Sequence, residues 1–300
     1  MYHQESYSRH GNWYNQHFPG AEAKVKYYQK VKSSGKKTIS GWLQQLFFSC
    51  LDPLLKNKEQ RWLTVGDAYG FDAQYILSQG GSALATDLNT DFLEVAKRQG
   101  VVKAYAAENA EKLSFNDGLF DYVLCKESYH HFPRPYAALY EMMRVAEKGI
   151  VLMEPQDPVS KMPLLLLLSN LLASRSRLLH KAWKNRFSFE PVGNFVYKVS
   201  EREFEKFAAG LNLPLVAFKK INPNFYFKGA ESMAADLINR KFLFIQAKNI
   251  LLDLLVKFKI LPGQVLVAVI FKTVPHAALT ESLKADGYHL VAIPKNPYVK

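Results

Sequence analysis

The stretch that decides the fold is "WLTVGDAYGFDAQYIL", residues 62–77. It opens with an apolar run typical of a buried strand, which we expect to include Gly66 and to end at Asp67. It then passes through a turn that contains Gly70 and continues as a helix from about Asp72. A strand that leads through a tight turn into a helix is the start of a βαβ unit. The turn departs from the usual glycine-rich nucleotide loop, because Tyr69 stands where a second glycine is expected.

The alternation of strands and helices continues after this unit. Amphipathic helices are predicted at 89–100 and 135–149, between short apolar runs that read as strands. Strands separated by helices imply a parallel sheet that is covered on both faces. We therefore predict an α/β, Rossmann-like fold with a seven-stranded, mostly parallel sheet and an inserted, largely helical substrate cap. Besides the strand at the start of 62–77, the predicted strands are 82–87, 101–108, 120–126, 150–155, 213–221 and 263–272.

Composition places the chain among globular proteins. It has 300 residues, of which 48% are hydrophobic, and a formal net charge of +12. The first residues carry no secretory signal, and the most apolar run, 162–173, is shorter than the roughly 20 residues that span a bilayer. Cys50 and Cys125 lie far apart, which indicates a reducing compartment and neither a disulfide framework nor a metal site. We expect a soluble, cytoplasmic protein with at most peripheral membrane contact.

The charge leaves two interpretations open. The basic residues can form a solvated surface, or they can attract an anionic partner such as a phosphorylated substrate or a lipid surface. No nucleic-acid-binding signature is present, so no nucleic-acid partner is expected. The organisation we predict is an N-terminal helical and aromatic cap segment at 1–60, a cofactor-binding core at 61–155, the substrate cap at 156–200, the remaining core with an extra helix at 201–273, and a C-terminal tail at 274–300. In the remaining core, Ser200 and Glu203 form a capping box at the start of a helix, and the extra helix is expected at roughly 230–259.

Three loops at the carboxyl edge of the predicted sheet suggest one ligand. At the first loop, a helix start after Asp67, Ala68 and Gly70 offers free N–H groups for a carboxylate, while Asp67 suits an ammonium group. This pair of charges fits the amino-acid part of a ligand. Such an interpretation of one loop is weak, because an acid followed by glycine is more often only a turn.

The second and third loops extend this ligand. Asp87, with Leu88 beside it, ends the second strand, where an acid can accept both hydroxyls of a ribose. Asn109 and the backbone of Ala110 follow the third strand and can bind an adenine edge. Amino acid, ribose and adenine in series describe S-adenosylmethionine, which we predict as the cofactor.

A longer stretch carries a family resemblance: "ENAEKLSFNDGLFDYVLCKESYHHFPRPYAALYEMMRVAEKGIVLMEP", residues 108–155. It resembles class I S-adenosylmethionine-dependent methyltransferases, most of all the broad group that includes ubiquinone/menaquinone-type and many small-molecule methyltransferases. The resemblance covers about residues 60–155 and continues more weakly to 265–272. It implies an enzyme that binds S-adenosylmethionine. The features shared with that group stand at 109–111, 113–115, 120–123, 130–131, 144–145 and 154–155.

Candidate catalytic residues follow the fourth strand. Methyl transfer needs alignment more than acid–base chemistry, and a base is required only when the acceptor must lose a proton. His130, His131 and Glu127 are candidates for that base, although paired histidines here often pack or cap a helix. Lys126 is expected beside the methionine end of the cofactor or in solvent. Aromatic residues that could wall the acceptor pocket, or simply pack in the core, are Tyr7, Trp13, Tyr14 and Tyr129.

The predicted function is methyl transfer from S-adenosylmethionine to a small-molecule or lipid-like acceptor, with oxygen as the expected atom. Leucines at 164–168 followed by basic residues suggest that the cap could receive an anionic or lipid-linked acceptor, although a buried cap helix explains them too. Alternatives are a carbon or nitrogen acceptor, or a methyltransferase-fold protein with a non-catalytic binding role. A nicotinamide dehydrogenase is disfavoured because Asp67 would face a pyrophosphate.

Overall fold

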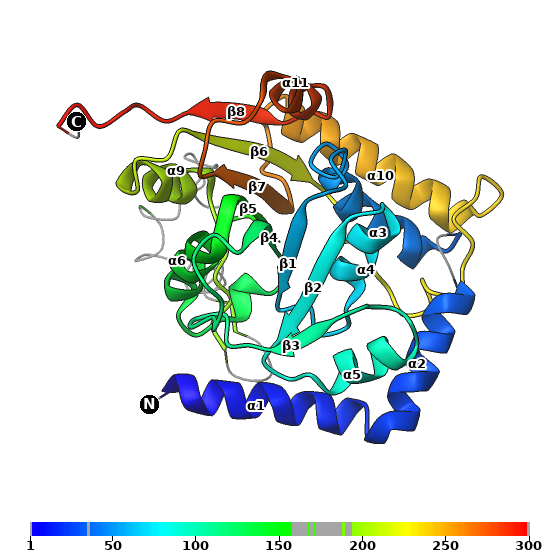
Figure 1. Ribbon diagram of the computed structural model, residues 1–300. Coiled ribbons are helices and arrows are strands. Elements are labelled where there is room, and N and C mark those ends of the chain that lie inside the picture. The colour runs from blue at the N-terminus through cyan, green and yellow to red at the C-terminus, as the bar shows by residue number, and fades with distance from the viewer. Residues whose placement is uncertain are drawn as a thin grey trace.

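The computed structural model of the chain describes residues 2–34, 37–157 and 194–298, together with the isolated positions 167, 171, 188 and 189. The predicted substrate cap at 156–200 lies mostly outside these residues, as do its basic positions and all but one of its leucines at 164–168. The fold is an α/β sandwich around one twisted sheet (Figure 1).

The sheet has the strand order β3-β2-β1-β4-β5-β7-β6-β8. The neighbouring pairs from β3 to β5 are parallel, whereas β7 runs antiparallel to both β5 and β6, and β8 runs antiparallel to β6. The predicted Rossmann-like, mostly parallel sheet is therefore confirmed. Its strands are β1 Arg61–Val65, β2 Ser82–Asp87, β3 Tyr105–Ala107, β4 Phe120–Lys126, β5 Ala146–Pro155, β6 Leu215–Ile221, β7 Val265–Phe271 and β8 His289–Ala292.

Helices cover both faces of the sheet (Figure 1). Helices α3, α4 and α5 lie on one side, and α6 and α9 lie on the other. Helix α10 runs along the outside of the molecule beside α3, and α1 crosses the far end of the sheet below β3 and α5. The helices are α1 Tyr2–His17, α2 Gly20–Ser34, α3 Ile39–Phe48, α4 Phe71–Ser78, α5 Asp91–Arg98, α6 Pro135–Val145, α9 Glu201–Gly210, α10 Arg240–Lys257 and α11 Ala277–Ala285, with short 3₁₀ turns at Ser49–Leu51 and Tyr129–His131.

The sheet separates two hydrophobic cores. Alternate side chains of β4 illustrate this: Tyr122 and Leu124 pack into the core beneath α3, α4 and α5, while Val123 and Cys125 pack beneath α6 and α9. Successive side chains of a strand point to opposite faces, so a strand covered on both sides must be apolar throughout. The continuous apolar runs of the sequence follow from this arrangement.

The C-terminal part differs from the sequence prediction in two ways. The sheet has an eighth strand, β8, where a tail was expected, because 289–292 pair with the free edge of β6. The long helix predicted at about 230–259 begins only at Arg240. Asn239 stops it there, since its side-chain oxygen accepts from Lys241 N and Phe242 N at 3.0 and 3.3 Å.

Candidate active site

A cavity of about 1210 Å³ opens where the parallel strands end. Asp67, Asp87 and Asn109 line it, at or just after the ends of β1, β2 and β3. Ligands bind at this edge in open α/β sheets. Of the predicted site residues, Gly70 and His130 do not line the cavity, and those that do are Asp67, Ala68, Asp87, Leu88, Asn109, Ala110, Lys126, Glu127 and His131.

The turn after β1 contains two left-handed glycines, Gly66 and Gly70, with φ of +71° and +73°. A Cβ on Gly66 would lie 2.5 Å from the Ser128 Cβ, and one on Gly70 would lie 2.6 Å from Val102 Cγ1. Only glycine fits both positions without strain or collision. The strand thus ends two residues before Asp67, which lies inside the turn. The prediction that Asp67 ends the strand was wrong, because Gly66 already lies in the turn.

Asp67 holds the start of α4. Its Oδ2 accepts from Ala73 N and from Thr64 Oγ1, both at 2.9 Å, and its Oδ1 accepts a longer bond of 3.3 Å from Asp72 N. Burial, and next the charge of Asp72, raise the pKa of Asp67 to about 8. Asp67 therefore accepts from backbone N–H groups at the start of α4 that have no partner within the helix. Its Oδ1 accepts only the longer of these bonds.

The Asp87 carboxylate accepts a hydrogen bond from the turn that follows it. Its Oδ1 accepts from Asn89 N at 2.9 Å, and burial raises its pKa to about 6. Leu88, the next residue, is half exposed and lines the cavity. This carboxylate is thus positioned at the cavity by its own loop and does not hold another element in place.

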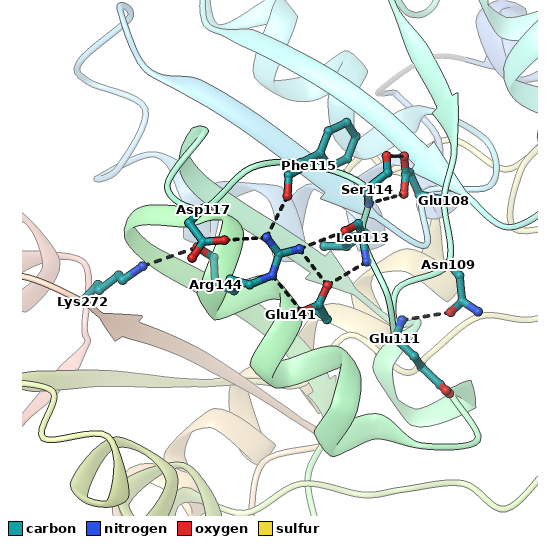
Figure 2. Close-up of polar contacts among 10 residues, drawn as sticks. All are labelled: Glu108, Asn109, Glu111, Leu113, Ser114, Phe115, Asp117, Glu141, Arg144 and Lys272. Carbon is teal, nitrogen blue, oxygen red and sulfur yellow. Dashed lines mark hydrogen bonds and ion pairs between the residues drawn. The ribbon is translucent and has the colours of Figure 1, made fainter.

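The loop after β3 is braced from α6. Arg144 on α6 donates from Nη2 to Leu113 O at 2.9 Å and from Nη1 to Phe115 O at 2.7 Å (Figure 2). Within the loop, Asn109 Oδ1 accepts from Glu111 N at 2.9 Å. The Asn109 side chain is therefore held by its own turn, and the backbone that carries it is fixed by a guanidinium that does not line the cavity.

Lys126, at the end of β4, is a buried cation with acidic and aromatic neighbours. Its Nζ lies 3.3 Å from Asp72 Oδ1, 3.9 Å from Glu127 Oε2 and 5.3 Å from the ring centre of Phe47. Burial lowers the pKa of Lys126 and is the largest single influence on it, but the acids Asp72, Glu127 and Asp67 together outweigh burial, so the net shift is upward. Lys126 therefore remains charged at neutral pH.

The loop after β4 is built around Glu154. This carboxylate is fully buried, and its Oε1 accepts from Ser128 N and Tyr129 N at 3.0 and 2.9 Å. Its Oε2 lies 2.5 Å from His130 Nδ1. His130 is consequently directed toward Glu154 and not toward the cavity, whereas the adjacent His131 does line the cavity.

His131 and Glu127 are the two candidate bases that reach the cavity. The His131 ring lies 3.9 Å from that of His130, and its carbonyl accepts from Asn194 Nδ2 at 3.2 Å. Glu127 has a φ of +50°, a backbone conformation uncommon for a residue with a side chain. Such strain is concentrated at functional sites, and here it stands next to Lys126 and Ser128.

The N-terminal helices cover the turn after β1 with aromatic rings. Tyr7 and Tyr14 line the cavity, whereas Trp13 packs against the core. The Tyr28 hydroxyl lies 2.8 Å from Tyr69 O, so α2 is bonded directly to the turn. The suggestion that Tyr129 walls the pocket was wrong, because it is fully buried beneath α6 and α9 and does not line the cavity.

Comparison with known protein families supplies the decisive observation. Residues 63–153, which hold β1 to β5 and the loops just described, match the methyltransferase domain family. The chain carries a class I S-adenosylmethionine-dependent methyltransferase domain. It is an enzyme of the transferase class, and its cofactor is S-adenosylmethionine. None of the curated proteins that were compared with this chain matches it.

The chain also resembles solved structures at low sequence identity, and their names differ in activity. A SAM-dependent methyltransferase from Methanosarcina mazei is 15% identical with a TM-score of 0.45, over 75% of this chain and 98% of its own. A 1,6-didemethyltoxoflavin-N1-methyltransferase from Burkholderia thailandensis, solved with S-adenosylhomocysteine, is 13% identical with a TM-score of 0.46, over 79% and 80%. The [4+2]-cyclase SpnF is 14% identical with a TM-score of 0.47, over 76% and 80%. These identities do not indicate which acceptor the methyltransferase domain uses.

Sequence reasoning missed several residues that shape the methyltransferase site. Gly66 was counted within the first strand, although a glycine directly before an acid at a strand end is a turn signal. Glu154 was noted only as part of a family motif, because its partners lie more than twenty residues away. The bond between Tyr28 and the turn could not be inferred from spacing, since it joins residues 41 positions apart.

Proposed function

We propose that the methyltransferase domain transfers the methyl group of S-adenosylmethionine to an oxygen atom of a small-molecule or lipid-like acceptor. One observation carries this proposal: Asp67, Asp87 and Asn109 come from three successive loops and open on the same cavity. The cavity volume of about 1210 Å³ exceeds the range of about 300–1,000 Å³ that is usual for small-ligand pockets. It therefore has room for a cofactor and an acceptor together.

The charges along the cavity suggest how the cofactor would lie. Asp87 would accept the ribose hydroxyls, and Asn109 with the backbone of Ala110 would bind adenine. The methionine part would lie at the turn after β1, with its ammonium group at Asp67 Oδ1 and its carboxylate near Lys126. Leu88 would border the ribose, and Gly70 would act through the shape of the turn, because it packs against Val102 and not toward the cavity.

Methyl transfer mainly requires the protein to align the acceptor atom with the methyl group. When bound, the cofactor supplies an activated methyl group on a sulfonium, so the site must align the acceptor with that group and exclude water. His131 would take the proton of an acceptor hydroxyl, and Glu127 is the second candidate. His130 would act only by packing against His131, because Glu154 holds its Nδ1.

The free thiols and the basic composition of the chain support a proposal for its compartment and its acceptor. We propose the cytoplasm as its compartment, because Cys50 and Cys125 are both buried as free thiols. For the acceptor, the basic composition supports an anionic or lipid-linked molecule. A phenol or a quinol would satisfy both the chemistry and the apolar part of the cavity wall.

The test is methylation by the purified chain. It is incubated with methyl-labelled cofactor and a panel of phenols, quinols and their lipid-linked forms, and products are identified by mass spectrometry. A labelled O-methyl product is expected. A labelled C-methyl or N-methyl product would replace oxygen as the acceptor atom, and cofactor binding without any labelled product would contradict the proposed transfer.

The role of His131 is tested in the same assay. His131→Ala is expected to lower kcat by about 10²-fold or more, because a general base contributes about 10²–10⁴-fold. The affinity for S-adenosylmethionine, measured by calorimetry, should not change. His289→Ala is the matched control, since His289 is exposed on β8 outside the cavity. A kcat equal to that of the control would remove His131 from the mechanism.

A further inference from the structure

Helix α10 packs against the protein along one narrow face. Phe242, Ile245 and Asn249, spaced three and four residues apart, are buried there. Phe242 meets the edge of the Trp42 ring on α3, with ring centres 5.3 Å apart. Asn249 Nδ2 donates to Asn222 O at 2.7 Å. This face fixes the rotation of the helix about its axis.

The opposite face of α10 is apolar and exposed. Positions 243, 247, 250, 254 and 258 are again three or four residues apart, so they form one stripe about half a turn from the buried face. The Phe244 ring, beside the stripe, is 64% exposed, and Ile238, in the turn before the helix, is 90% exposed. The large apolar residues exposed here are Leu237, Ile238, Leu243, Phe244, Ile250, Leu251, Leu254, Phe258 and Ile260.

This stripe is more than the scattered apolar residues of an ordinary surface. Helix α10 is not apolar all round, since Lys248 and Asp253 interrupt it, but it carries large apolar side chains on its outer face as well as on its buried face. Contiguous exposed apolar patches mark sites of interaction with proteins, ligands or membranes. Figure 1 shows α10 along the outside of the molecule, with one long side turned away from the sheet.

The net charge around the stripe is positive, because basic residues outnumber acids there. The two acids of this segment are already bonded: Asp253 Oδ1 accepts from Asn222 Nδ2 at 2.7 Å, and Asp236 Oδ1 accepts from Asn239 N at 3.0 Å. The Lys248 ammonium lies 5.7 Å from the ring centre of Phe244, at the border of the stripe. The exposed basic residues of the helix and its flank are Arg240, Lys241, Lys248, Lys257 and Lys259.

The positive charges distinguish between two partners that could cover the outer face of α10, a second copy of the chain and a lipid surface. A second copy of this chain, packed stripe to stripe, would bring the same basic residues against one another, and like charges destabilise such a contact. An anionic lipid surface would attract them, while the acyl region would take up the apolar side chains. An interfacial helix combines these two features, an apolar face with Lys and Arg beside it.

We propose that the outer face of α10, with the turn at 237–238, docks the protein on an anionic lipid membrane. The helix would lie in the plane of the interface with Phe244, Leu251 and Phe258 among the acyl chains. Within the described part of the chain, no helix is both long and apolar enough to cross a bilayer. The inference does not depend on the acceptor or on methyl transfer.

The test is co-sedimentation of the full chain with vesicles of phosphatidylcholine, with and without phosphatidylserine. The chain is expected to bind the anionic vesicles at low salt, more weakly at high salt, and at least tenfold more weakly to neutral ones. Phe244→Asp should weaken binding to the anionic vesicles at least tenfold. Equal binding to both vesicle types, or none to either, would overturn the proposal.

The matched control is Tyr298→Asp, which makes the same charge change at an apolar position that is 93% exposed at the other end of the chain. It should bind vesicles as the unmodified chain does, and thermal unfolding should show that both variants are folded. Equal losses in the two variants would mean that charge alone drives binding, and would overturn the assignment to α10. A chain that is dimeric by light scattering, becomes monomeric with Phe244→Asp and ignores vesicles would assign the stripe to a second copy instead.

Discussion

Asp67 and Asp87 lie at the same edge of the sheet, yet their surroundings differ. Asp67 accepts from two backbone N–H groups of α4 and from the Thr64 hydroxyl. The Asp87 carboxylate accepts from Asn89 N in its own turn. Both are buried, with pKa values raised to about 8 and about 6. The first carboxylate is part of how the chain folds, and the second is positioned at the cavity without holding another element.

An acid at the end of a strand can therefore stabilise the fold, bind a ligand, or do both. The loss of Asp67 should therefore appear first in stability, and the loss of Asp87 should appear in affinity alone.

The largest effect is expected from Asp67→Ala. The substitution removes the side-chain acceptor of Ala73 N at the start of α4, and it leaves Thr64 Oγ1 with only the longer bond of 3.5 Å to Leu84 O. Losses of this kind cost about 2–4 kcal/mol in total. The free energy of unfolding of the cofactor-free chain, measured with denaturant, checks this. If Asp67→Ala lowered the free energy of unfolding no more than Asp87→Ala does, Asp67 would not stabilise the fold more than Asp87.

Asp87→Ala is expected to act on the ligand. It should weaken binding of S-adenosylmethionine by about 1–3 kcal/mol through lost ribose hydrogen bonds, while unfolding changes by less than about 1 kcal/mol. Calorimetric titration of the cofactor measures the first quantity and denaturant unfolding the second. An unchanged affinity would show that the end of β2 is not where the ribose lies.

The remaining effect is a dependence of stability on pH. A carboxyl group whose folded pKa is raised binds its proton more tightly in the folded chain than in the unfolded one. Its contribution is complete below about pH 4 and is lost as pH rises through about 6 for Asp87 and about 8 for Asp67. The free energy of unfolding should therefore fall between pH 5 and pH 8, by at most about 1.4 kcal/mol per pH unit for each proton.

Asp67→Asn is the variant that isolates this pH effect. It removes the titrating group at nearly constant volume, so the decline between pH 6 and pH 8 should become shallower than in the unmodified chain. Asp72, Lys126 and Glu127 remain as the charged neighbours in both proteins. The same slope in both would mean that Asp67 is already ionised in the folded state.

Local pattern was enough to predict much of the fold. The run "FDYVLCK" is β4 from its first residue to its last, and β2 ends at Asp87 as expected. Ser200 caps α9 by accepting from Glu203 N at 3.2 Å, as the capping box predicts. In each case the determining residues are neighbours in sequence.

What could not be predicted depends on contacts between distant residues. Strand β8 exists because β6 offers a free edge, which a short polar segment does not reveal. The turn at Gly66 is set by the approach of Ser128, whose Oγ donates to Gly66 O at 2.7 Å across 62 residues. The direction of His130 depends on Glu154, and two adjacent histidines look alike in a sequence.

The central claim is that the cofactor lies at this sheet edge with its ribose on Asp87. The most direct measurement is a crystal structure of the chain grown with S-adenosylhomocysteine. We predict the ribose hydroxyls within hydrogen-bond distance of the Asp87 carboxylate and the adenine beside Asn109. The claim would be contradicted if the ligand were bound elsewhere, or if it occupied the cavity with its ribose turned away from Asp87.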